Sequence, residues 1–237
     1  EPIAPVLQEW YRKLGIEILE GYGLTETFGY ATSNVNGKNK TGTVGIAQPR
    51  TTLKIAEDGE IWIKNGAAMV GYYRDPEATA AVLSGGYIRT GDHCELDKDG
   101  HLHITGRIKD IFKTDTGKYI APAMIEHRFL AENPWIEQLC VTGSRLSQPM
   151  VLCVLTPSAR QEKPEFVKNE CLKALERMNQ HLNNHERVTR CVLIEDDWTV
   201  ESGMMTPTLK VRRHQVEKHY SSLISKAAAN RDVVVYQ

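Results

Sequence analysis

The feature of this sequence that most constrains its fold is a set of three glycine turns, each placed between short strand-like segments. EDG stands at 57–59, KDG at 98–100 and DTG at 115–117. TLKIA and EIWIK flank the first turn, and YIRTGDHCELD and HLHITGR flank the second. A glycine turn between such runs is typical of an antiparallel β-hairpin. We therefore expect a small β-rich subdomain over residues 42–106.

Helical patterns surround these hairpins. PVLQEWYRKL at 5–14 carries apolar residues at helical spacing, and Gly15 should end that helix. The apolar run IEIL at 16–19 is expected to be a strand that leads into the stretch EGYGLTET. Between the hairpins, Asp75 caps and Pro76 opens a predicted helix, DPEATAAVL.

Strands and helices mix after the second hairpin. IKDIFKT and KYIAP predict two strands joined by DTG, IEQLCVTG and MVLCVLTP predict paired strands, and RCVLIED predicts one more. Pro122 opens a predicted helix with Ile125, Phe129 and Leu130 on one side. Residues 163–186 predict a long polar helix, and PTLKVRRHQVEKHYSSLISKA predicts a closing helix.

The expected fold class is α/β of the mixed α+β kind, in two parts. We place the boundary at residues 106–109, where the absence of a Gly/Ser linker predicts a tight hinge. Residues 1–106 would contain the loop 20–27 and the β-rich subdomain, and residues 107–237 would form a compact α+β domain.

Composition excludes several classes of protein. The net charge of −1 provides no basic field for nucleic acid, and runs such as MVLCVL are too short to span a bilayer. EPIAPVLQEW does not have the pattern of a signal peptide. The five cysteines include no CxxC pair, so we expect buried, reduced thiols in a cytosolic protein. His101 and His103 are expected on one solvated face of a strand, with no third metal ligand close by in sequence.

Two stretches have residues suited to a nucleotide. In EGYGLTET, Gly21 and Gly23 would let the backbone approach a ligand closely, and threonine hydroxyls can bind phosphate oxygens. Glu26 fits beside phosphates if a divalent cation lies between them, because Mg²⁺ is commonly held by one or two carboxylates plus phosphate oxygens. In YIRTGD, Asp92 can accept two hydrogen bonds from the vicinal diol of a ribose. Each stretch alone also fits an ordinary turn.

Two further stretches are basic. Residues 105–122 interleave four Arg or Lys residues with strand-forming ones, and Lys210 lies near the start of the predicted closing helix. A lysine there gains nothing from the helix dipole, which raises the question of whether it serves a ligand. The alternatives are the solvated face of a hairpin and an ordinary surface lysine.

In this order and spacing the four stretches resemble one family, the adenylate-forming (AMP-binding) acyl-CoA synthetases, and within it the long-chain fatty acid–CoA ligases. GYGLTET matches its YGxTE segment, and GYIRTGD matches its aromatic-x-x-TGD segment. GRIKDIFKTDTGKYIAPAMIE matches GRxKDxxKxxxGxxxxPxxIE, and TPTLKVRRHQVEKHY resembles the TPTxKxxR ending. The chain would then comprise the end of the N-terminal AMP-binding domain, residues 1–106, and the mobile C-terminal lid domain, residues 107–237.

The resemblance implies a role for each matching residue. The nucleotide would contact Gly21, Tyr22, Gly23, Thr25, Asp92 and Arg107, with Tyr22 against the adenine, Thr25 at the phosphates and Asp92 at the ribose. The catalytic residues would be Glu26, which holds Mg²⁺, Lys109 at the hinge and Lys210, which enters the site during adenylation. Lys113, Gly117 and Lys118 would face the site in the step that uses coenzyme A.

The implied reaction joins a fatty acid to coenzyme A through an acyl-adenylate, with ATP, Mg²⁺ and coenzyme A as co-reactants and AMP as product. The implied protein is cytoplasmic, without nucleic-acid partners or a transmembrane segment. Peripheral membrane association and oligomeric state stay open. The family's Ser/Thr/Gly-rich phosphate loop has no counterpart in these residues, so we expect this chain alone to be inactive and to bind ATP weakly or not at all. Two alternatives remain: a ligase for another carboxylate or acceptor, and a non-catalytic interaction module built on helix 163–186 and the basic VRRHQVEKH.

Overall fold

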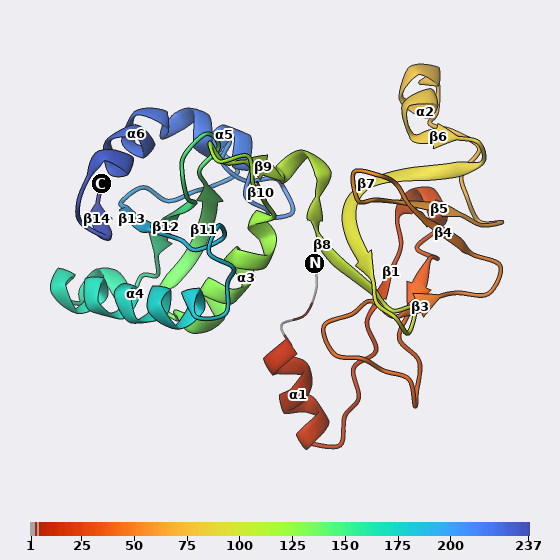
Figure 1. The fold of residues 1–237 in the computed structure, drawn as a ribbon, viewed down its shortest axis with the longest axis horizontal. Helices are drawn as coiled ribbons and strands as arrows, with labels where there is room; N and C mark the ends of the chain where they lie inside the picture. Colours follow the sequence, from red (N-terminus) through yellow and green to blue (C-terminus); the bar gives the residue numbers. More distant parts are fainter. Residues whose placement is uncertain (1–2, 4) are drawn as a thin grey trace. The chain divides into compact units, whose positions relative to one another are not determined.

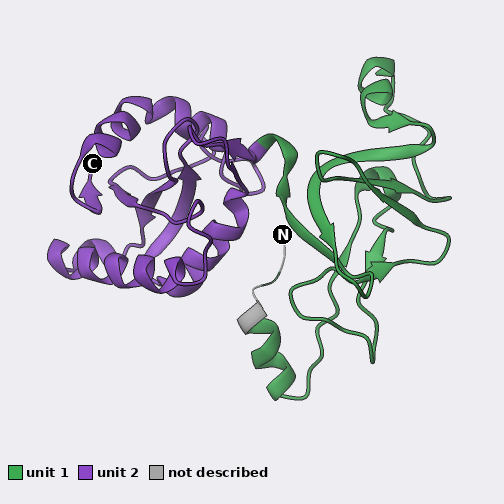
Figure 2. Cartoon of the chain, viewed as in Figure 1, with its two compact units in different colours: residues 1–109 green, residues 110–237 purple. Residues whose placement is uncertain are grey.

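The computed structural model describes Ile3 and residues 5–237. The chain divides into two compact units, residues 1–109 and residues 110–237 (Figure 2). Each unit has its own sheets and its own hydrophobic core.

The first unit begins with α1 (Pro5–Lys13), which confirms the predicted helix. Gly15 ends it in the left-handed region at φ 78°, and the N–H of Ile16 reaches back to the carbonyl of Tyr11 at 3.0 Å. The predicted strand at 16–19 is wrong: these residues pair with no strand in the described part of the chain, and Ile16 is 52% exposed. A run of apolar residues becomes a strand only where a neighbouring strand accepts its backbone hydrogen bonds.

Two small sheets follow α1 in the first unit. One has the order β1-β2-β3, and the other has the order β4-β5-β7-β6 with β8 paired to β7. The β4–β5 and β7–β8 pairs are antiparallel, which confirms both predicted hairpins. The bounds are β1 (Gly21–Tyr22), β2 (Thr32–Ser33), β3 (Ile46–Ala47), β4 (Thr52–Ile55), β5 (Glu60–Lys64), β6 (Leu83–Ser84), β7 (Tyr87–Leu96) and β8 (Leu102–Arg107).

Residues from both sheets contribute to the core of the first unit, in which Ile61, Ile63 and Leu102 are fully buried. The predicted helix is confirmed as α2 (Pro76–Val82), where the Asp75 carboxylate accepts a hydrogen bond from the N–H of Ala78 at 2.9 Å.

A four-stranded sheet of order β11-β12-β13-β14 forms the centre of the second unit (Figure 1). The edge strand β11 is antiparallel to β12, and β12, β13 and β14 are parallel. The helices α3 and α4 cover one face of this sheet, and α5 and α6 cover the other. The bounds are β11 (Ile136–Thr142), β12 (Met150–Leu155), β13 (Arg190–Ile194), β14 (Val234–Tyr236), α3 (Pro122–Glu132), α4 (Pro164–Asn179), α5 (Arg213–His219) and α6 (Ser221–Ala229).

Strand alternation places the core of this unit on both faces of its sheet. Val151, Cys153 and Leu193 face α3 and α4, whereas Leu152 and Val192 face α5 and α6. The central strands are therefore apolar on both sides, as is usual for strands covered by helices on both faces.

The closing segment differs from the prediction. It is two helices, α5 and α6, that meet at Tyr220, and the stretch from Pro207 to Arg212 is not helical. Leu209 adopts a left-handed conformation at φ 57°, which a right-handed α-helix cannot contain. Lys210 consequently lies in a turn before α5, and the last strand, β14, was not predicted.

The helix predicted at 163–186 is also shorter, because α4 ends at Asn179. The Asn179 side chain pairs with both backbone groups of Val188, at 2.9 and 3.0 Å, so the chain turns back there. In α3 the predicted face holds for Ile125 and Phe129, which are buried, but Leu130 is 40% exposed.

The histidine prediction is wrong in one part. His101 precedes β8 and is 91% buried rather than solvated, with its Nε2 at 3.1 Å from the carbonyl of Lys38. No group of three or more His, Cys, Asp or Glu side chains among the described residues could hold a metal ion. All five cysteines are free and buried, as predicted. No helix in the described part of the chain has the length and apolar character needed to cross a membrane.

Candidate active site

Three of the predicted nucleotide residues meet in the first unit. The Tyr22 hydroxyl donates to Oδ2 of Asp92 at 2.5 Å, and the Arg107 Nε lies 2.9 Å from Oδ1 of the same carboxylate. Arg107 also donates to the carbonyl of Thr90 at 3.1 Å. Burial, followed by the charge of Asp92, raises the pKa of the Tyr22 phenol well above its usual 10. The phenol therefore stays protonated and acts as a donor to Asp92.

A distortion of β7 decides where Asp92 points. Glu60 of β5 pairs with His93 and Trp62 pairs with Arg89, so β7 contains two more residues than β5 over this stretch. Gly91 sits in the extra segment at φ 69°, a left-handed conformation that favours glycine. Bulges of this kind re-aim side chains beside active sites. Asp92 thus lies inside β7.

Sequence reasoning missed Glu60, which holds this bulge. Its buried carboxylate accepts from the Gly91 N–H at 2.8 Å through Oε1. Its Oε2 accepts from the Trp62 indole at 2.7 Å and from Arg89 at 3.2 Å. From the sequence, a glutamate at the start of a strand is expected to face solvent. The pairing of β5 with β7 buries the Glu60 side chain instead.

A pocket of about 520 Å³ opens beside Tyr22 and is bordered by β1 and β2. Gly23 lets two chain segments approach closely at its rim, since a Cβ added there would lie 2.2 Å from the carbonyl carbon of Gly29. The pocket is lined by Gly21, Tyr22, Gly23, Gly29, Tyr30, Ala31, Thr32, Ser33 and Gln48.

Thr25 and Glu26 do not line this pocket and lie in a short 3-10 helix, η1 (Thr25–Thr27), between the lining residues Gly23 and Gly29. The Tyr72 hydroxyl donates to Oε1 of Glu26 at 2.6 Å, a contact that sequence reasoning did not foresee. This hydrogen bond raises the pKa of Tyr72. The second oxygen of Glu26 carries no hydrogen bond from the described residues, so it can accept a cation.

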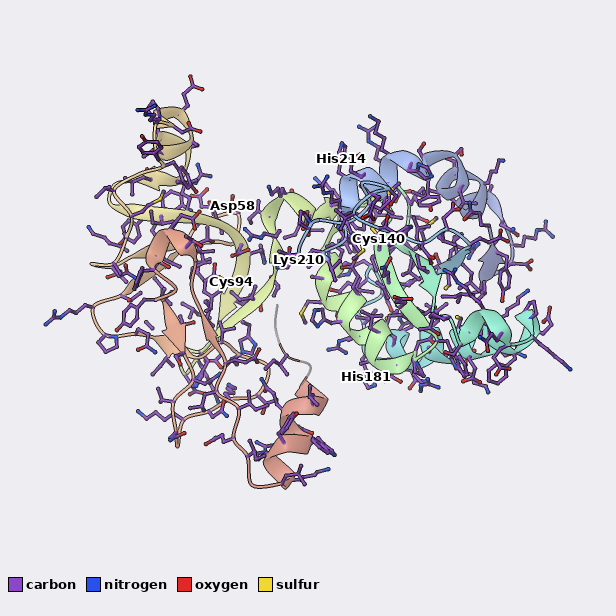
Figure 3. The ribbon with its side chains drawn as sticks, turned by 180° about the vertical axis from the view of Figure 1, so that it is seen from behind. Asp58, Cys94, Cys140, His181, Lys210 and His214 are labelled. Atoms are coloured by element: carbon purple, nitrogen blue, oxygen red, sulfur yellow. The ribbon has the colours of Figure 1, made fainter. Side chains whose placement is uncertain are left out.

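The other predicted site residues lie elsewhere. Lys109 belongs to the short 3-10 helix η2 (Ile108–Asp110) and is the last residue of the first unit. Lys113 lies in β9 (Phe112–Lys113), which pairs with β10 (Tyr119–Ile120) and confirms that hairpin. Lys210, which Figure 3 labels, lies in a turn of the second unit.

The turns that present Lys118 and Lys210 have the same construction. In the first, the Thr114 N–H donates to the carbonyl of Lys118 at 2.9 Å, and the Lys118 N–H donates to Oγ1 of Thr114 at 3.1 Å. The corresponding distances between Thr206 and Lys210 are 2.8 and 3.1 Å. Each turn is a three-residue hairpin loop that places one exposed lysine at its end.

The residue before each lysine adopts the left-handed conformation, Gly117 at φ 81° and Leu209 at φ 57°. Leucine rarely adopts this conformation, so the sequence carries no signal for a turn at Lys210 and its pattern indicated a helix instead.

This fold and these residues define a class of protein, and the family comparison agrees. Residues 109–232 match the AMP-binding enzyme C-terminal domain, and residues 1–73 match the AMP-binding enzyme family. The chain belongs to the AMP-binding, adenylate-forming enzymes of the acyl-CoA synthetase type.

Among curated proteins, the chain is 34% identical to the long-chain-fatty-acid–CoA ligase FadD15 of Mycobacterium bovis, over 93% of this chain and 40% of that protein. It is 30% identical to the long-chain-fatty-acid–CoA ligase 5 of Mus musculus, over 93% of this chain and 36% of that protein. The chain therefore spans about two fifths of the length of the relatives it matches.

Among solved structures, the adenylation domain of a carboxylate reductase from Mycobacterium chelonae superposes with a TM-score of 0.81 at 25% identity. The match covers 97% of this chain and 38% of that one. An anthranilate CoA ligase in complex with anthranoyl-AMP superposes with a TM-score of 0.76 at 21% identity, over 95% of this chain and 44% of that one, and shares the fold.

Proposed function

We propose that these 237 residues are the C-terminal part of an ATP-dependent long-chain fatty acid–CoA ligase. The observation that carries the proposal is the Tyr22–Asp92–Arg107 cluster beside an open pocket, in a chain whose curated relatives are named as fatty acid–CoA ligases. In this proposal residues 1–106 end the AMP-binding domain and residues 107–237 are the mobile lid.

Asp92 suits a ribose because its carboxylate is fixed in place and still has unused hydrogen-bond acceptor sites. Tyr22 and Arg107 each use one oxygen, and a carboxylate oxygen has two lone-pair sites. One acceptor site therefore remains on each oxygen for the two hydroxyls of a vicinal diol. The Tyr22 ring would lie against the adenine, with Gly21, Gly23 and Thr25 around the nucleotide.

The residues present fit a Mg²⁺ ion shared with phosphates. Glu26 offers a carboxylate oxygen that Tyr72 does not occupy, and Mg²⁺ is commonly held by one or two carboxylates plus substrate phosphate oxygens. When bound, the ion would supply positive charge to the phosphates during adenylation.

The proposed reaction has two steps. The fatty acid carboxylate attacks the α-phosphate of ATP, forming acyl-adenylate and releasing pyrophosphate. The coenzyme A thiol then attacks the acyl carbon, loses its proton and displaces AMP. Lys210 would stabilise the negative charge of the first step, because a compact ammonium on a flexible stem can be delivered and withdrawn. Lys109 would be the hinge, and the turn with Lys113, Gly117 and Lys118 would face the site in the second step.

The test is the variant Lys210→Ala in the full-length protein that contains these residues. Acyl-dependent exchange of pyrophosphate into ATP should fall about 10²–10³-fold, the loss typical of one positioned electrostatic donor. Thioester formation from supplied acyl-adenylate should stay nearly unchanged. Lys226→Ala, at an exposed lysine of α6, is the matched control. Normal exchange in Lys210→Ala would contradict the assignment.

The acyl substrate is tested separately, with palmitate against acetate as the carboxylate. Preference for palmitate supports the long-chain proposal, and preference for acetate would replace it with a ligase for another carboxylate. The five free, buried cysteines fit a reducing compartment, and we propose the cytoplasm as the location.

A further inference from the structure

A largely buried ion pair joins the segment after the Lys210 turn to the sheet of the second unit. Arg213 follows Lys210 by three residues and is the first residue of α5. Its Nη2 lies 2.7 Å from Oε1 of Glu126 in α3, and the two side chains are only 15% and 16% exposed. The pair therefore ties the start of α5 to a helix on the opposite face of the sheet.

Both members of this pair also bind the same residue of the edge strand. The N–H of Val141 donates to Oε1 of Glu126 at 2.8 Å, and the carbonyl of Val141 accepts from Nη1 of Arg213. Because β11 is an edge strand, these two backbone groups have no neighbouring strand on their side. The ion pair takes the place of that strand.

A second contact, one helical turn later in α5, fixes where this helix lies along β11. Glu217 lies four residues after Arg213 and accepts a hydrogen bond from the Thr142 hydroxyl at 2.7 Å. Val216 is fully buried between these contacts. The start of α5 thus has one position along the edge strand.

The Lys210 turn is fixed at the same place because a very short stem, two paired backbone segments, connects it to the start of α5. Met205 and Val211 form an antiparallel bridge, and the Arg212 N–H donates to the carbonyl of Met204 at 2.7 Å. Arg213 comes next in the chain. Any sliding of α5 along β11 would therefore carry the stem and the lysine with it.

Stability alone does not account for such a pair. Removing two charges from water is costly, and well-packed apolar side chains of similar size often stabilise a fold as much. The Nε of Arg213 is also buried without an acceptor among the described residues. A pair that fixes the register between elements is the use that best fits these contacts.

We propose that Glu126 and Arg213 are positioning residues for Lys210, holding its turn at one place on the edge of the sheet. The effect on the turn stands independently, and the effect on adenylation rests on the proposed function.

The first experiment measures amide hydrogen exchange in the 237-residue chain and in its Arg213→Met, Arg213→Lys and Glu126→Gln variants. The amides of Thr206 and Arg212, which donate within the turn and its stem, should exchange at least about tenfold faster in Arg213→Met, because hydrogen bonds to charged groups are lost. Arg213→Lys keeps the charge without the planar fork and should give an intermediate rate. Glu126→Gln is the milder variant should Arg213→Met not fold.

The control is Arg177→Met. Arg177 makes the same kind of contacts, 2.7 Å to Oε2 of Glu132 and 2.9 Å to its carbonyl, but far along the chain from the turn. It should leave exchange in the turn unchanged. If the variants of Arg213 and Glu126 leave the turn amides unchanged, or speed up the β13 amides equally, the pair is merely structural and the proposal is overturned.

The second experiment measures both half-reactions in the full-length protein. Arg213→Met and Glu126→Gln should lower kcat for pyrophosphate exchange about tenfold or more, with a change of less than about twofold in KM for ATP and in thioester formation from supplied acyl-adenylate. A normal kcat with a faster-exchanging turn would overturn the catalytic part. If the unmodified protein forms no adenylate, the proposed function fails while the exchange result still decides whether the pair positions the turn.

Discussion

At the scale of single residues, Asp92 shows how a local distortion prepares a site. Its carboxylate is placed by a bulge in β7 that Gly91 permits and that the buried Glu60 stabilises. Tyr22, 70 residues away in sequence, then donates to it. Asp92 is buried and each of its two carboxylate oxygens has one partner, which holds the carboxylate in one orientation. In the proposed function, the remaining acceptor site on each oxygen would receive one ribose hydroxyl.

The raised pKa of Tyr22 leads to a prediction about alkaline pH. An unfolded tyrosine ionises near pH 10, whereas the folded phenol keeps its proton above that pH, so the folded state binds more protons there. Folding stability of the first unit should therefore fall as the pH rises above about 10, by about 1.4 kcal/mol per pH unit for this group. The buried Cys94, whose pKa burial raises to about 12, adds a fall that begins near pH 9.

The measurement is the free energy of unfolding between pH 8 and pH 12. Tyr22→Phe should make the fall of the unfolding free energy above pH 10 less steep, by the contribution of one proton, about 1.4 kcal/mol per pH unit. Tyr73→Phe, at a ring that is 84% exposed, is the control and should leave the slope unchanged. An unchanged slope in Tyr22→Phe would show that the folded structure does not raise the pKa of this phenol.

At the scale of elements, α4 has a different role from the one its composition indicates. The helix is largely polar in sequence, yet Val167, Cys171 and Leu175 lie on one face and are buried in the core of the second unit. Three or four apolar residues at helical spacing are enough to dock a helix. The apolar face of α4 is therefore part of the core of the second unit, and only its polar side faces solvent.

We expect Leu175→Ala to lower the free energy of unfolding of the second unit by about 2–5 kcal/mol, the usual cost of truncating a buried leucine. Chemical denaturation provides the measurement. Glu176→Ala, at the neighbouring exposed position, should change it by less than about 0.5 kcal/mol. Similar small effects of both substitutions would place α4 outside the core.

At the scale of the whole molecule, each of the two units has its own core among the described residues. The core of the first unit is built around Ile61 and Ile63, and that of the second unit lies on both faces of the β11-β12-β13-β14 sheet. A hinge between two such bodies needs only a few residues to absorb the change of φ and ψ. Lys109 and Asp110 stand where one unit ends and the other begins.

Two independent cores predict two thermal transitions in calorimetry of the 237-residue chain. Leu175→Ala should lower only the transition of the second unit, and Ile63→Ala only that of the first, each by several degrees. One transition that both substitutions shift equally would contradict independent unfolding.

Local patterns allowed much of the fold to be predicted, and long-range pairing accounts for the misses. The hairpins around Gly59 and Gly100, α1, α2, α3 and the β11–β12 pair follow from turn residues, caps and alternation, which act over a few residues. The strand expected at 16–19 and the unpredicted β14 depend on whether a distant segment offers a free edge. The turn at Lys210 depends on Leu209 adopting a conformation that leucine rarely takes.

The sequence by itself determined the family, the hairpins and helices that local signals mark, and the residue types available for chemistry, because motifs and turn signals are local properties of the chain. Only the tertiary structure decided that Tyr22, Asp92 and Arg107 share one cluster and that Glu60 supports it. It alone placed Arg213 and Glu126 on the two backbone groups of Val141. These contacts join residues far apart in sequence, and strand register and helix docking, which no local signal specifies, bring them together.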